Sequence, residues 1–207
     1  ITIDLIKGLD WALLQVDASL EIYADLALSP RGVWPVRYRP LHDELLSSWL
    51  IRLAHGHGLS AANFSSVVLG SARQLWRADI DRYAPELLVQ AIAAGVQCAD
   101  DEVISTSLRS LEGLVFERLN TRSRVPWLLM LEPGHRWQAS NGLVYCPACL
   151  AADAVPYFRK SWRLGFVTFC HLHRCLMWED AVDARHPLQR HPLLVILFRP
   201  WETAPNV

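Results

Sequence analysis

The chain has 207 residues, of which 52% are hydrophobic and 20% are charged, so it can bury a core and is not a disordered chain. Its 20 basic and 21 acidic side chains give a net charge of -1, which excludes a uniformly basic nucleic-acid-binding protein. Since no apolar run approaches the ~18 residues that span a bilayer and no export signal is recognisable, we expect a cytoplasmic protein without membrane contact.

Residues 1–33 are expected to form a helical extension, with one helix over 5–28. Its apolar residues recur at helical spacing at Leu5, Ile6, Leu9, Leu13, Leu14 and Val16. The turn-forming residues 29–32 end it, and prolines favour an extended chain over 34–40.

Residues 34–125 predict a helical region that begins with a helix-turn-helix-like pair. Asp43 is expected to cap the first helix, Gly58 to turn the chain, Ser60 to cap the second helix and Gly70 to end it. The predicted inward residues are Leu45, Leu46, Trp49, Leu50, Leu53 and Ala54 in the first helix, and Ala61, Phe64, Val67, Val68 and Leu69 in the second. Any αα-hairpin produces this pattern, so DNA binding and simple packing both remain open.

A second helix pair follows in the same region. Pro85 is expected to open a helix that Gly95 ends, and Asp100 or Asp101 to cap the next one. The predicted inward residues are Leu87, Leu88, Ala91, Ile92, Val103, Ile104, Leu108 and Leu111. The acidic residues 100–102 disfavour phosphate contact, so a packing pair is the preferred interpretation here.

Residues 126–178 predict a zinc-binding module, followed by a C-terminal tail over 179–207. Cys146 and Cys149 form a CxxC, and after 20 intervening residues Cys170 and His173 form a CxxH. Two such pairs can close a tetrahedral structural Zn²⁺ site in which the protein fills all four positions, which leaves none for catalysis. The alternatives are a pair of reduced buried cysteines and a redox CxxC.

Two residues near this pattern, and the distant Cys98, are expected to play no part in the metal site. His171 directly follows Cys170, from where its ring cannot easily turn to the same metal. Cys175 is a rival fourth ligand but is expected to be a core thiol, and Cys98 a small buried hydrophobe.

Candidate DNA contacts come from two kinds of residue. Polar residues of the second helix are candidate base readers, because that helix enters the groove in the helix-turn-helix motif: Ser60, Asn63, Ser65 and Ser66. Local basic sets are candidate phosphate contacts: Arg73, Arg77, Arg118, Arg122, Arg124, Arg159, Lys160 and Arg163. In the cysteine module the alternative is that arginine stems cover an aromatic core.

Tryptophans outside the two predicted helix faces are candidate anchors for a protein partner. Charged residues flank Trp76, which makes it the preferred anchor, and Trp201 is a further candidate. Trp127 lies in an apolar run, so a core position is the favoured interpretation for it.

We expect no enzymatic activity. His42 and Glu44 form an HxE that superficially resembles zinc deaminases, but the gap of about a hundred residues to the CxxC is too long for that compact site. The chain has no phosphate-binding glycine loop and no hydrolase or metalloprotease motif.

Three stretches together resemble the TniQ family, to which the TnsD-type target selectors of transposons belong. The first is Arg39-Pro40 with residues 43–50, 52–54 and 58–60; the second is 145–150 with Asp153; the third is 156–159 with 162–164, Cys170 and His173. The family usually carries a further CxxC, which is missing after residue 178, so the chain resembles a short or truncated member.

The resemblance implies a mainly α fold with helix-turn-helix units followed by a zinc ribbon that binds structural Zn²⁺. It also implies a non-catalytic target-site selector or adaptor in DNA transposition. Such proteins bind DNA or an RNA-guided CRISPR-type complex and recruit a TnsC-like AAA+ ATPase, and some form homodimers. The rival hypothesis is a zinc-containing helix-turn-helix transcription regulator.

Overall fold

The computed structural model describes residues 32–69, 75–77, 79–119, 125–129 and 143–180. The helix expected over 5–28, the helix end at Gly70 and the partner anchor Trp201 lie outside these ranges. Within them the chain is mainly helical, with two small sheets toward the C-terminal side, which confirms the predicted fold class.

The first helix, α2 (Leu46–Gly56), buries the apolar face that the sequence predicts, including Trp49 and Leu53. The prediction that Asp43 caps this helix is wrong, because the N-cap position belongs to Leu45. Asp43 instead adopts a left-handed conformation with φ of 58°, and its carboxylate accepts hydrogen bonds from the backbone N–H and hydroxyl of Ser161.

The second helix, α3 (Ala61–Val67), begins as predicted. Gly58 takes the φ of 68° that a tight turn requires and glycine adopts freely. The Ser60 hydroxyl then accepts the Asn63 N–H at 3.2 Å as the N-cap. The inward position predicted for Val67 is wrong: the helix ends there, and the side chain is exposed.

The second pair consists of α5 (Glu86–Val96) and α6 (Asp100–Thr106), which pack together. Pro85 stands directly before α5 as its N-cap, but Leu87, predicted to face inward, is exposed. The other short elements here are the 3₁₀ helices η1 (Leu75–Arg77) and η2 (Leu108–Leu111) and the helix α4 (Ile80–Tyr83).

The prediction that Gly95 ends α5 is wrong, because Gly95 lies inside the helix. The helix ends at Val96, and its C-cap Gln97 takes a left-handed φ of 58°. A Cβ on Gly95 would clash with the indole ring of Trp34. The backbone N–H of Trp34 donates to the Gly95 carbonyl at 2.8 Å. The glycine is therefore a close-packing position rather than a helix terminator.

The acidic residues at the start of α6 do not cap it, contrary to prediction. The N-cap is Ala99, while Asp100, Asp101 and Glu102 occupy the first turn, where negative charge is favourable to the helix dipole. The chain leaves the helix at Ser107, so Leu108 is buried from η2 rather than from α6.

The cysteine module follows as a compact set of short elements. They are β1 (Leu143–Tyr145), α7 (Pro147–Ala152), the 3₁₀ helix η3 (Lys160–Arg163), β2 (Phe169–Cys170), β3 (Cys175–Leu176) and β4 (Trp178–Asp180). Strand β1 pairs antiparallel with β4, with Tyr145 opposite Trp178, so the two ends of the module are joined. Strands β2 and β3 form a second antiparallel pair, with Phe169 opposite Leu176.

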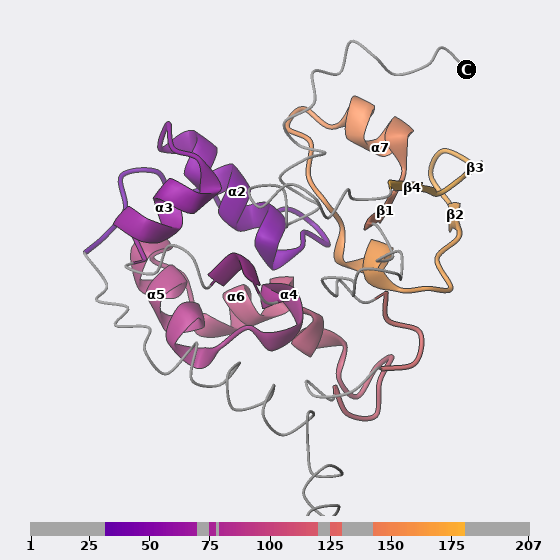
Figure 1. Ribbon diagram of the computed structural model, residues 1–207, viewed down its shortest axis with the longest axis horizontal. Coiled ribbons are helices and arrows are strands. Elements are labelled where there is room, and N and C mark those ends of the chain that lie inside the picture. Colours follow the sequence, from indigo (N-terminus) through magenta and orange to yellow (C-terminus); the bar gives the residue numbers. More distant parts are fainter. Residues whose placement is uncertain (1–31, 70–74, 78, 120–124, 130–142, 181–207) are drawn as a thin grey trace, which may run out of the picture.

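Figure 1 shows α2 to α6 gathered on one side of the structure and α7 with the four strands on the other. One hydrophobic cluster is built from the helical side alone, between Trp34 and Val103. A second cluster combines Leu45, Ile51 and Leu108 of the helical side with module residues such as Phe158 and Trp162. Residues on both sides of the boundary expected near residue 125 thus share one cluster.

A buried polar network also joins the two sides. Arg163 is only 1% exposed, and its guanidinium pairs with Asp79 at 2.5 Å and with Asp81 at 3.4 Å. The same side chain donates to the Leu129 carbonyl, and Asp81 accepts from both the backbone N–H and the hydroxyl of Ser47. One cation of the module therefore contacts two buried acidic side chains of the helical side.

This network predicts a pH dependence of stability. Burial, and after it the charge of Asp79, raise the pKa of Asp81 to about 7, because Arg163 and the hydrogen bonds from Ser47 offset these two effects only in part. Because the folded protein keeps this proton to higher pH than the unfolded chain, the free energy of unfolding falls as pH rises from about 4 to about 7.

We expect Asp81→Asn to remove that fall, which urea unfolding at about pH 5 and about pH 8 will measure. The exposed control Asp101→Asn should keep the pH dependence of the wild type. Equal pH dependence in wild type and Asp81→Asn would show that Asp81 does not titrate in this range.

None of the helices in the described ranges combines the length and the hydrophobicity that crossing a membrane requires.

Candidate metal centre

Short elements at two places in the module position the four predicted ligands. Cys146 leaves β1 and caps α7, where Pro147 occupies the first turn and the Cys146 sulfur accepts the Cys149 N–H at 3.4 Å. Cys170 ends β2, and His173 lies in the turn between β2 and β3. The strand-to-helix turn and the hairpin turn thus present two ligands each.

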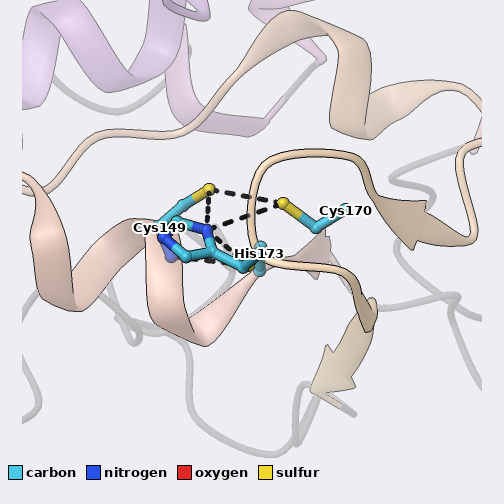
Figure 2. Close-up of side chains that lie close together, drawn as sticks. Cys149, Cys170 and His173 are labelled. Atoms are coloured by element: carbon cyan, nitrogen blue, oxygen red, sulfur yellow. Dashed lines mark hydrogen bonds between the residues drawn. The ribbon is translucent and has the colours of Figure 1, made fainter.

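The four ligand atoms lie within 4.8 Å of one another. Figure 2 shows Cys149, Cys170 and His173 converging. The two sulfurs are 3.6 Å apart, and Nδ1 of His173 lies 3.2 Å from the sulfur of Cys149 and 3.7 Å from that of Cys170. The sulfur of Cys146 is also 3.7 Å from that nitrogen. Tetrahedral zinc with Zn–S bonds of about 2.3 Å separates its ligands by about 3.7 Å, so these spacings fit the ion.

The donor set also fits zinc in its chemistry. Three thiols and one imidazole are the ligand types of closed structural zinc sites, and the protein supplies all four. The three cysteines are buried, whereas His173 is exposed and covers the outer side. The residues present could therefore hold a Zn²⁺ ion through Nδ1 of the histidine, with no position left for a reacting water.

The surroundings shift the pKa values of the three ligand thiols in different directions. Burial raises the pKa of Cys146 and of Cys149. Burial also acts to raise that of Cys170, but hydrogen bonds from His173, first from its backbone N–H, and from the other two cysteines outweigh it and lower the pKa to about 6. A bound zinc ion would favour the thiolate form of all three.

His171 and Cys175, the rival ligands, lie outside the group of four converging side chains. His171 is exposed and is not part of the group that converges among the described residues. Cys175, predicted to be a core thiol, is only partly buried, and its sulfur lies 3.6 Å from that of Cys146. A strand before the CxxC and a helix after it would suit a redox pair, but the proximity of Cys170 and His173 to Cys149 favours a metal.

Two of the predicted DNA contacts are wrong. Arg163 is buried against Asp79 and Asp81, so its guanidinium cannot reach a phosphate. Ser65 is also buried: its hydroxyl donates to the Ala61 carbonyl at 2.8 Å and accepts the indole N–H of Trp76 at 2.8 Å. A polar residue in the chain can thus be an internal hydrogen-bonding group, which its sequence position alone does not reveal.

The other two cations of the module are held by protein groups. Arg159 pairs with Asp153 at 2.8 Å and lies over the rings of Tyr157 and Trp162, which is the arginine-over-aromatic alternative left open above. Lys160 donates to the Ser105 carbonyl and to the Ser110 hydroxyl, and burial lowers its pKa. Both side chains link parts of the fold.

The remaining candidates are exposed, or lie where the structure gives no side-chain description. Ser60, Asn63 and Arg118 are exposed, and Ser66 is half-buried with its hydroxyl donating to the Ala62 carbonyl. Arg77 belongs to η1, with no description of its side chain, and the other three lie outside the described ranges: Arg73, Arg122 and Arg124.

The burial of Trp76 and Trp127 is the reverse of what the sequence predicts. Trp76, the preferred anchor, is partly buried, packs against both hydrophobic clusters and donates to Ser65. Trp127, predicted to lie in the core, is 66% exposed and has a φ of 66°. Cys98, predicted to be buried, is only partly so.

Sequence reasoning missed the residues that join the two sides. Asp79 and Asp81 lie far from Arg163 in the chain, and no local pattern marks them as partners. Asp is rarely buried unless it is paired, so the sequence carried no signal for this network.

The TniQ family model matches residues 35–177, more than half of the chain, in a segment that contains the first helix pair and all four ligands of the metal centre. A search of curated proteins found no match.

Proposed function

Since this chain belongs to the TniQ family, we propose that it is a cytoplasmic target-site selector or adaptor in DNA transposition. In this role it binds DNA, or docks on an RNA-guided CRISPR-type complex, and recruits a TnsC-like AAA+ ATPase, as a monomer or a homodimer. The observation that carries the proposal is the family match over 35–177, within which the two ligand pairs converge. Four protein ligands would fill every position around the ion, as in structural zinc sites, whereas a catalytic ion keeps one position open.

The first helix pair is the proposed DNA-contacting part. Helix α3 presents exposed Asn63 next to its Ser60 cap, and the exposed start of a second helix is where base readers lie in helix-turn-helix proteins. Among the described basic residues of the module, Arg163 is buried and Arg159 and Lys160 are engaged by protein groups, which leaves Arg174 exposed for a phosphate. We therefore expect weak DNA binding with a shallow salt dependence.

The module offers the apolar surface that a protein partner requires. Phe169 and Leu176 are opposite each other in the β2–β3 pair and are both exposed, and Trp178 in β4 is partly so. Trp127 is a further exposed anchor: its carbonyl accepts the Gly165 N–H, one residue before exposed Phe166. Exposed aromatic side chains of this kind dominate many interfaces.

The experiment is light scattering of the chain mixed with the AAA+ ATPase of the same transposon, together with DNA binding followed by fluorescence anisotropy. We expect a stable complex with the ATPase that Trp127→Ala weakens at least about tenfold. The control Val155→Ala, also an exposed apolar residue of the module, should leave it unchanged. Asn63→Ala should weaken only DNA binding.

The opposite result identifies the rival function. A chain that ignores the ATPase but binds one promoter sequence tightly at physiological salt would be a transcription regulator, and the adaptor proposal would be abandoned.

A further inference from the structure

A fifth sulfur-containing side chain lies beside the metal centre but outside the converging group. The sulfur of Cys175 is 3.6 Å from that of Cys146, and the group within mutual ligand distance comprises Cys146, Cys149, Cys170 and His173. Cys175 opens β3 and is the register partner of Cys170, which ends β2. The hairpin thus carries one thiol of the centre and one thiol at its edge.

Exposure distinguishes Cys175 from the ligand thiols. Cys146 is fully buried, and Cys149 and Cys170 are nearly so, whereas Cys175 is partly exposed at the end of an exposed turn. A dissolved oxidant therefore meets Cys175 before the ligands.

We infer that Cys175 is an oxidation site that forms a disulfide with Cys146 and thereby removes a ligand from the metal centre. The inference rests on the metal centre proposed above. The oxidant is a peroxide: hydrogen peroxide converts the Cys175 thiol to a sulfenic acid and releases one water. The Cys146 thiolate then attacks the Cys175 sulfur, the S–S bond forms, and the departing hydroxide takes a proton to become the second water.

The geometry requires only a small movement for this step. A disulfide has an S–S distance of about 2.05 Å, so the two sulfurs must approach by roughly 1.5 Å. The turn between β2 and β3 is exposed over residues 171–174, and Cys175 directly follows it at the edge of the hydrophobic cluster that contains Cys146. Cys149 and Cys170 are equally close at 3.6 Å, but both are buried, so the oxidant reaches them last.

Loss of Cys146 as a ligand has two structural consequences. The metal keeps only Cys149, Cys170 and His173, so it binds more weakly and is released. The Cys146 sulfur also accepts the Cys149 N–H at the start of α7, so oxidation weakens the cap of that helix.

The test is treatment of the full, zinc-loaded chain with hydrogen peroxide. A colorimetric chelator follows zinc release, and mass spectrometry of the digested protein identifies the cross-linked peptides. We expect a Cys146–Cys175 link that forms together with zinc release. Cys175→Ser should abolish the link and slow release several-fold, whereas Cys98→Ser, a partly exposed thiol away from the centre, should behave as wild type.

Two results would overturn the inference: a Cys149–Cys170 link as the main product, or equal release rates in wild type and Cys175→Ser. Failure of the metal centre itself gives a different result, because untreated protein would then hold no zinc. The cross-link alone still decides whether Cys175 and Cys146 form the oxidation site.

Discussion

Cys149→Ser is expected to lose the metal and the folded structure of the module, with partial damage to the helical part. The sulfur of Cys149 contacts both Cys170 and His173, so replacing it removes two of the contacts within the ligand group. Structural zinc sites contribute apparent binding energies of about 10–16 kcal/mol, as much as or more than the whole stability of a small domain.

The damage to the helical part follows from the shared cluster. Leu45, Ile51 and Leu108 are buried against the module, and exposing side chains of this size costs roughly 1.5–3 kcal/mol each. The other cluster, between Trp34 and Val103, is built from helices alone and remains. The helical part should therefore stay folded but become several kcal/mol less stable.

Metal analysis and far-UV circular dichroism measure the two effects separately. The variant should hold no zinc, keep most of its helical signal at low temperature, melt at a lower temperature and bind a dye for exposed apolar surface. Cys98→Ser is the matched control, because that thiol lies away from the centre. An unchanged zinc content and melting curve in Cys149→Ser would refute the ligand assignment.

Arg163→Ala is expected to lower the free energy of unfolding by about 3–5 kcal/mol, because it leaves the buried Asp79 carboxylate without its counter-charge and removes a hydrogen-bond donor from Asp81. Asp79 receives two hydrogen bonds from this guanidinium, and Asp81 is fully buried beside it. Chemical denaturation measures the loss. The exposed Arg118→Ala should change stability by less than about 0.5 kcal/mol.

A combined variant tests the electrostatic explanation. Replacing the whole group, with Arg163→Met, Asp79→Asn and Asp81→Asn together, removes the unpaired charge and should recover much of the loss. If the triple variant is as unstable as Arg163→Ala, the damage comes from lost packing and not from an unpaired carboxylate.

The local pattern of the chain was sufficient to predict the first helix pair and the four side chains that converge in the module. The Ser60 cap, the Gly58 turn and the buried face of α2 follow from spacing and side-chain chemistry within a few residues. The CxxC and CxxH pairs were equally local, and the fold brings all four side chains together.

What escaped prediction depends on contacts between distant segments. Asp43 appeared to be a cap for its own helix, but it accepts hydrogen bonds from Ser161. Gly95 appeared to be a helix end, but it makes room for Trp34. Arg163 appeared to be a surface cation, but the carboxylates that bury it lie more than eighty residues away, and no sequence window contains both partners.

The most direct test of the account is the zinc content of the purified full chain, measured by plasma mass spectrometry after removal of loosely bound metal. The account predicts about one zinc per folded chain, lost in Cys149→Ser and kept in Cys98→Ser. A well-folded wild-type chain with less than about half an equivalent of zinc would contradict a structural metal centre at these four residues.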